Sequence, residues 1–179
     1  AFLIQFNSSG VRQWGTYYGG SGNDRGFGIA TATNANVYLS GMTTTGSGTD
    51  IATTDAHQLT NGGGPSDTYF AEFNSSGVRI YGTYYGELGD EIGFGCAVDN
   101  SGKVYLSGYT SSTVNIATSA SHQPIFGGVV DGYLVRFEPC NAPPAPTDIT
   151  PLVNHTICLA ETASLSVSGL GSINWYSSP

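Results

Sequence analysis

Apolar residues alternate with polar or variable residues in three short segments, which are residues 2–6, 69–73 and 133–137. The first, third and fifth positions are apolar in every copy, and the fourth holds Gln5, Glu72 and Arg136 in turn. A position that accepts neutral, negative and positive side chains faces water, so the period of two predicts β-strands with one buried face. The second position is always leucine or phenylalanine. We therefore expect the other face to be partly covered, as in sheets stacked face to face.

The three segments belong to a longer internal repeat. Residues 6–12, 15–19 and 37–41 recur as residues 73–79, 82–86 and 104–108, always 67 positions later. Residues 51–53 recur 65 positions later, and the third strand-like segment follows the second by 64. The spacing shrinks only in the loops, where length changes cost little. A repeat of about 65 residues indicates one structural unit used more than once.

Each unit contains four strand candidates, which in the second copy are residues 69–73, 78–85, 94–99 and 104–109. Asn74–Gly77 and Asn100–Gly102 have the composition of tight turns, so both connections are predicted to be antiparallel hairpins. Four antiparallel strands at a constant period predict an all-β fold made of β-propeller blades. Residues 1–138 would hold two full blades plus one strand, which is an incomplete ring because closed propellers have about 4–8 blades. We expect the rest of a longer chain, or other copies of this chain, to complete it.

The composition changes after residue 138. Five prolines between Pro139 and Pro151 predict an extended linker over residues 139–153, because proline fixes φ and removes a backbone donor. Residues 157–167 alternate again, which predicts a β-strand. Cys140 and Cys158 flank the linker and could form a disulfide, or each could pair elsewhere. Cys96 lies in an apolar run and is predicted to pack as a small hydrophobe.

The composition narrows the class of protein. Charged residues are 10 % of the chain, below the ~25 % of ordinary globular proteins, and the 26 glycines disfavour helices. The net charge is −8 with five Lys and Arg together, so a nucleic-acid partner is excluded because too few cations can replace the counterions of phosphate. No apolar run approaches the ~20 residues that a membrane-spanning helix needs, so we expect no membrane insertion.

The repeat resembles a known bacterial family. Residues 83–91, 93–110 and 127–137 carry the turn, strand and glycine positions of SBBP (seven-bladed β-propeller) repeats, and the resemblance covers residues 1–137. Residues 154–179 resemble the first strands of immunoglobulin-like domains common in Bacteroidetes surface proteins, and this resemblance implies the start of a β-sandwich there. The resemblance implies a repeat protein that is extracellular or held at the cell surface in association with the outer membrane, exported by type IX secretion, and without an assigned catalytic site.

One loop motif raises the question of a bound ion. Residues 19–24 partly match the calcium motif GGxGxD, and carboxylates are the ligands that calcium prefers. Asp24 and Asp90 are therefore calcium candidates. The second copy breaks the motif, which favours a loop whose aspartate accepts backbone hydrogen bonds. No cofactor is expected, with calcium kept as a candidate.

Repeated aromatic pairs offer a second kind of site. Tyr17, Tyr18, Tyr84 and Tyr85 could stack on sugars if they are exposed, and otherwise pack between the units. His57 and His122 also recur, whereas a catalytic site needs unlike groups that converge once. No Ser/His/Asp set can be assembled, so we predict that the chain is not an enzyme.

These observations predict a secreted or cell-surface structural or binding module, with adhesion or ligand presentation by the Thr/Gly/Ser-rich loops Thr43–Asp50 and Thr60–Ser66. Surface glycans are candidate partners. One alternative is a structural subunit of an extracellular assembly or filament. Another is an accessory carbohydrate-binding module of a larger secreted enzyme.

Overall fold

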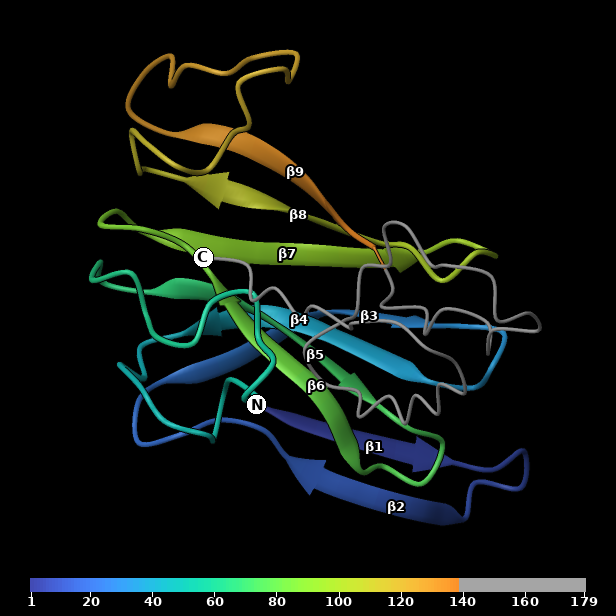
Figure 1. Ribbon diagram of the computed structural model, residues 1–179. Coiled ribbons are helices and arrows are strands. Elements are labelled where there is room, and N and C mark those ends of the chain that lie inside the picture. Colours follow the sequence, from blue (N-terminus) through green and yellow to red (C-terminus); the bar gives the residue numbers. More distant parts are fainter. Residues whose placement is uncertain (139–179) are drawn as a thin grey trace, which may run out of the picture. The chain divides into compact units, whose positions relative to one another are not determined.

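The structure, a computed structural model, describes residues 1–138 as nine β-strands without a helix (Figure 1). The strands are β1 (Phe2–Phe6), β2 (Arg12–Tyr17), β3 (Asp24–Thr31), β4 (Val37–Thr43), β5 (Asp67–Phe73), β6 (Arg79–Tyr85), β7 (Glu91–Val98), β8 (Val104–Thr110) and β9 (Asp131–Phe137). This part of the chain holds no helix long and apolar enough to cross a membrane. The predicted linker at 139–153, the immunoglobulin-like start at 154–179 and the Cys140–Cys158 bond lie outside the described residues.

The all-β, antiparallel prediction is confirmed, but the strands are grouped differently from the sequence repeat. Residues 1–138 form three sheets with the orders β1-β2, β3-β4-β5-β6 and β7-β8-β9, so within this range only the central sheet has four strands. The predicted grouping was two four-stranded units and one extra strand. Residues 44–66 return the chain to the same sheet, whereas residues 86–90 carry it into the next one. There Ser66 and Asp90 form a parallel bridge, and the Glu91 N–H donates to the Ser66 carbonyl (2.8 Å).

The hairpins form where the repeat predicts them. The side-chain oxygen of Asn7 accepts from the Val11 N–H (2.9 Å), and Asn74 accepts from the Val78 N–H (3.0 Å) in the same way. Gly77 closes its turn at φ 79°, a left-handed backbone that favours glycine. The local sequence therefore fixes which strands are neighbours within a hairpin.

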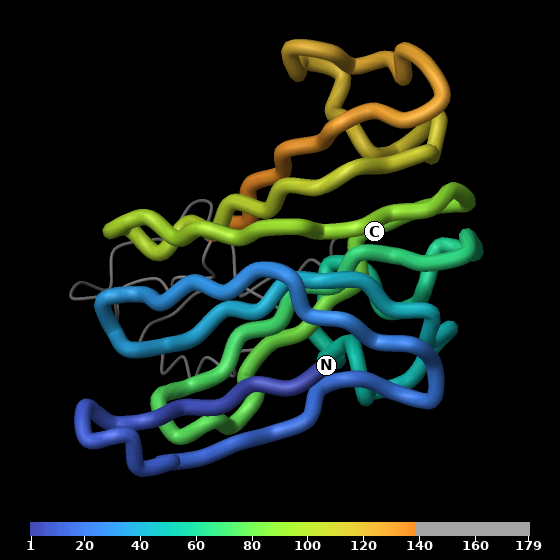
Figure 2. Tube along the Cα trace, turned by 180° about the vertical axis from the view of Figure 1, so that it is seen from behind, coloured from blue at the N-terminus to red at the C-terminus, as the bar shows by residue number. Residues whose placement is uncertain are grey.

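Two hydrophobic cores lie between the sheets. Core 1, between the first two sheets, consists of Leu3, Tyr18, Val37, Leu39, Ile51, Ala52, Tyr69, Ala71, Phe73 and Tyr84. Core 2, between the second and third sheets, consists of Tyr38, Phe70, Tyr85, Val104, Leu106 and Tyr133, with Ile116, Val135 and Phe137 among the residues packed against it. Most members of core 2 are the repeat equivalents of core 1 members. Figure 2 shows the sheets following one another from β1–β2 to β9.

The same hydrogen bond closes both cores. The Tyr18 hydroxyl donates to the Ile51 carbonyl (2.7 Å), and the Tyr85 hydroxyl donates to the Ile116 carbonyl (2.6 Å). Cys96 packs against core 2, as predicted for a small hydrophobe, and burial raises the pKa of its thiol. Each sheet is thus joined to the next by one repeated interface.

The outermost surfaces of the stack are the exposed counterparts of these interfaces. Phe2, Ile4 and Phe6 are 65, 41 and 58 % exposed, although their equivalents in β5 are at most 2 % exposed. The prediction that this face of β1 is buried is wrong, because no sheet of residues 1–138 lies against it. We call Phe2, Ile4, Phe6 and Tyr17 the N-terminal face. Leu134 is 75 % exposed, and with Tyr105 it forms the C-terminal face.

Candidate functional site

The connections that carry the chain from one sheet to the next end at a carboxylate. Asp24 begins β3 opposite Thr43, and its repeat equivalent Glu91 begins β7 opposite Thr110. In each pair the threonine hydroxyl donates to the carboxylate. Glu91 also accepts from the Glu87 N–H (2.9 Å). The carboxylate therefore ties the crossing loop to the neighbouring strand.

Both calcium candidates, Asp24 and Asp90, accept hydrogen bonds from other groups of the protein. Asp24 accepts from the Gly20 N–H (3.0 Å) in addition to Thr43. Asp90 accepts from the Tyr109 hydroxyl (2.8 Å) and the Ser66 hydroxyl. The two aspartates have separate sets of partners. Among residues 1–138, no three His, Cys, Asp or Glu side chains are grouped so that they could hold a metal ion.

Sequence reasoning missed a buried pair of carboxyl groups, Asp67 and Glu91. Both side chains are fully buried. Asp67 Oδ2 accepts from the Gly62 N–H (2.7 Å), whereas Oδ1 has no hydrogen-bond partner. A β-carbon built on Gly86 would lie 2.8 Å from Asp67 Oδ1 and 2.7 Å from Glu91 Oε2. Glycine at this position therefore leaves room for two carboxyl groups to approach one another.

This environment favours a protonated Asp67. Burial raises the pKa of Asp67 from 3.8 to about 7, the Gly62 N–H opposes that rise, and the Glu91 carboxylate adds to it. An ionised Asp67 would hold its negative charge in a buried site near the Glu91 carboxyl group, which is costly. A proton on Asp67 removes that cost. The junction between the second and third sheets is thus sensitive to pH near neutrality.

The tyrosine pairs divide between core and surface. Tyr18, Tyr84 and Tyr85 are buried in the two cores, so their ring faces are not open to a sugar. Tyr17 is 90 % exposed because it occupies the same place as Tyr84 but has no sheet in front of it. The sequence correctly indicated inter-unit packing as one role of these pairs, but it could not tell Tyr17 from its repeat equivalent.

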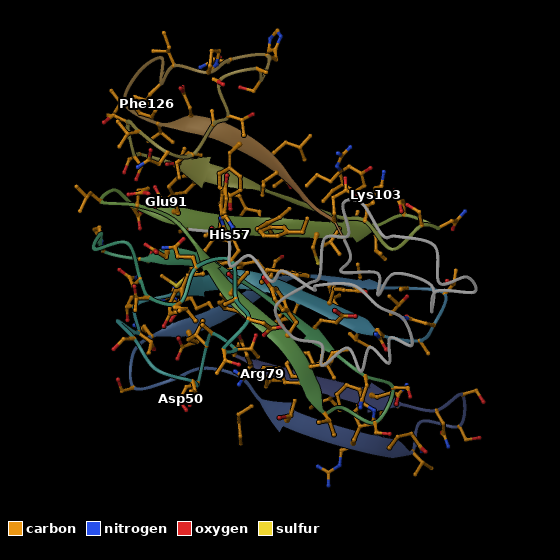
Figure 3. All side chains as sticks on the ribbon, viewed as in Figure 1. Asp50, His57, Arg79, Glu91, Lys103 and Phe126 are labelled. Carbon is orange, nitrogen blue, oxygen red and sulfur yellow. The ribbon has the colours of Figure 1, made fainter. Side chains whose placement is uncertain are left out.

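The long loop between β4 and β5 presents an exposed tip that is held in place. Residues 46–50 are exposed throughout. Arg79 donates to the carbonyls of Thr49 and Asp50, both at 2.7 Å, and Ser47 pairs with Thr60 in an isolated bridge. Figure 3 shows Arg79 beside Asp50, on the side of the molecule where this loop lies. Because these contacts fix the backbone of the tip, a ligand would meet a preorganised surface.

Comparison with protein-family models and with curated proteins found no match. The resemblance to SBBP repeats and to immunoglobulin-like domains therefore stays a prediction. The junction carboxylates, Asp24 and Glu91, did leave a signal in the sequence. Asp24 and Glu91 lie 67 positions apart, and each has a threonine 19 positions later that becomes its partner.

The free energy of unfolding should fall as pH rises from about 4 to above 7. The folded state raises the pKa of Asp67 to about 7. The contribution of this group to the free energy of unfolding is therefore fully present below the ordinary carboxyl pKa, and it is lost as pH rises through the raised value. Asp67→Asn should flatten this part of the profile, measured by urea unfolding at a series of pH values. Asp131→Asn, at the equivalent site in β9, serves as the control and should retain the slope. An unchanged slope in Asp67→Asn would contradict this assignment.

Proposed function

We propose that the chain is a non-catalytic structural and binding module of a secreted or cell-surface protein, acting in adhesion or ligand presentation. The observation that carries this proposal is the preorganised, exposed tip of the β4–β5 loop, residues 46–50. Stacked sheets provide a rigid support, and binding residues commonly lie on loops that such a support positions. The tip offers hydroxyl, carboxylate and backbone groups, which suit polar ligands such as surface glycans.

The repetition of the polar networks supports a role without catalysis. The carboxylate of Asp24 and that of Glu91 serve the same purpose at successive junctions. Gln58 with Asp67 is repeated by Gln123 with Asp131 in the same way. Groups that recur in each unit hold loops to strands, whereas catalysis needs different groups that meet at one place.

We also propose that the sheets are blades of a β-propeller. The first strands of successive sheets, β3 and β7, contact one another, while β7 contacts β5 of the central sheet less than β3 or β4. Sheets that approach closely at their first strands and separate toward their last ones suit a fan around an axis. Further sheets would have to come from other chain segments or other copies.

The binding role can be tested by changing the loop tip. Full-length chain should bind saturably to at least one component of a printed array of cell-surface polysaccharides and extracellular-matrix proteins. Thr49→Ala combined with Asp50→Ala should weaken that binding by about tenfold or more, because both side chains lie on the exposed tip. Ser8→Ala combined with Ser9→Ala, in the exposed β1–β2 hairpin, is the matched control. Absence of any binding, or equal loss in the control, would contradict the proposal, as would turnover of a bound polymer.

A second candidate function is a subunit of an extracellular assembly, and the two end faces favour it. The apolar residues of β1 on the N-terminal face are the repeat equivalents of Tyr69, Ala71 and Phe73, which are buried in core 1. The C-terminal face offers Leu134, the equivalent of Leu3 and Phe70, which each face an adjacent sheet. The two faces therefore match the two sides of the interface between sheets. Association of copies through unlike faces would be head to tail.

The wild-type chain should then form oligomers whose mass grows with concentration in analytical ultracentrifugation. Phe2→Glu blocks the N-terminal face and Leu134→Glu blocks the C-terminal face, so each variant alone should be monomeric. An equimolar mixture should form dimers and stop there, because each variant keeps the face that the other lacks. Leu88→Glu, at a loop leucine with the same 75 % exposure as Leu134, is the control and should still form oligomers. A monomeric wild type, or a mixture that stays monomeric, would contradict this second function.

A further inference from the structure

The third sheet lacks the outer strand that completes the central sheet. β5 pairs with β4 on one side and with β6 on the other, whereas β9, its repeat equivalent, pairs only with β8 among residues 1–138. A groove of about 710 Å³ lies beside β9, between this strand and the loop of residues 111–130. Figure 3 labels Phe126, which lies on that loop and lines the groove. In the central sheet the corresponding space between β5 and its loop is filled by β6.

We propose that this groove binds an extended peptide segment as an additional strand of the third sheet. The segment would carry the pattern that β2 and β6 share, which is Arg, any residue, an aromatic residue, then Gly-Thr-Tyr-Tyr-Gly. Outward-facing N–H and C=O groups of an edge strand pair readily with an added strand, and peptide recognition of this kind is widespread. The filled position one repeat earlier supplies the geometry of the complex.

The loop side of the groove is already arranged to hold a peptide backbone. In the central sheet, Gln58 Nε2 donates to the Gly86 carbonyl and its Oε1 accepts from the Gly86 N–H, both at 3.0 Å. Gln123 is the equivalent of Gln58. It donates to the Ile125 carbonyl (3.3 Å) and to Asp131 Oδ2 (3.0 Å), which are the counterparts of the contacts that orient Gln58. The Gln123 amide is therefore held in place although no equivalent of β6 pairs with β9 among residues 1–138. It can bind the backbone of an added strand.

The closing hydrogen bond of core 2 dictates a glycine in the ligand. A β-carbon on Gly82 of β6 would lie 2.3 Å from the Ile51 carbonyl oxygen and 3.0 Å from the Tyr18 hydroxyl, so no larger residue fits there. The same pair recurs beside the groove as Tyr85 and Ile116. The incoming strand must therefore carry glycine where it lies opposite Val135, the equivalent of Ala71, which faces Gly82 in the central sheet. This requirement separates the proposed ligand from an arbitrary hydrophobic peptide.

The groove also has a place for an aromatic ring. Tyr84 of β6 lies opposite Tyr69 and is fully buried in core 1. Tyr133 stands in the place of Tyr69, and it lines the groove together with Tyr85 and Ile116. The first tyrosine of the Tyr-Tyr pair would enter core 2 there, and its burial would add apolar area to the complex.

The test uses a fluorescein-labelled peptide of residues 78–87 with blocked ends, titrated with the full 179-residue chain. Fluorescence anisotropy should show saturable binding, and hydrogen exchange should show new protection of alternate amides in Gly132–Phe137. A peptide with Gly82→Val should bind about tenfold or more weakly, because its side chain would overlap the Ile116 carbonyl. Gln123→Ala in the chain should also weaken binding.

The exposed Gln13 provides the matched control, since Gln13→Ala removes the same side chain far along the sequence from the groove and should leave the affinity unchanged. Three results would each overturn the proposal. These are no saturable binding, equal affinities of the wild-type and Gly82→Val peptides, and binding that does not protect β9. The last result would place the peptide elsewhere, for example on the N-terminal face.

Discussion

The structure depends on one interface, in which an aromatic face of each sheet packs against the sheet before it. In core 1 this face is Tyr69, Ala71 and Phe73 of β5, and in core 2 it is Tyr133, Val135 and Phe137 of β9. A two-stranded hairpin is marginal by itself, and a larger sheet needs a buried hydrophobic face to be stable. Stacking gives each sheet that burial. The consequence is that every sheet depends on its neighbours, and apolar side chains on the two outermost surfaces, such as Phe2 and Leu134, stay exposed.

The strands and the period of the stack could be predicted from the sequence because they are local. Asn74 and Gly77 define a turn, and alternation around Glu72 correctly predicts a strand. The prediction that this position faces water is only partly met at Glu72, which is half-buried and accepts from the Tyr38 hydroxyl. The grouping of strands into sheets could not be predicted in this way, because it depends on whether a connection, such as residues 44–66 or residues 86–90, returns to the same sheet or crosses to the next. Burial was likewise predicted correctly for Phe73 but not for Phe6, although both carry the same sequence around them. Identical residues have different environments because only one of them has a neighbouring sheet.

The difference between local features and features that depend on stacking also explains which parts of the candidate sites could be predicted from the sequence. The aspartate of the loop motif was correctly predicted as a possible acceptor of loop hydrogen bonds, and Asp24 does accept from Gly20. The proximity of Asp67 to Glu91 could not be predicted, because residues from two sheets meet only after stacking. The groove beside β9 likewise depends on how the strands are grouped into sheets, because it corresponds to the space that β6 fills one repeat earlier. The polar junctions between sheets thus derive their properties from the repeated interface.

The most direct measurement is the free energy of unfolding of two equivalent variants, Phe73→Ala and Phe6→Ala, by urea titration of the full chain. Phe73 is 2 % exposed in core 1, so its truncation should cost about 3–5 kcal/mol, whereas the exposed Phe6 should cost less than about 1 kcal/mol. If Phe73→Ala does not fold, the pair Phe73→Leu and Phe6→Leu should keep the same order. Equal losses at the two positions would contradict the account, because they would show that stability does not come from the stacking of one sheet on the next.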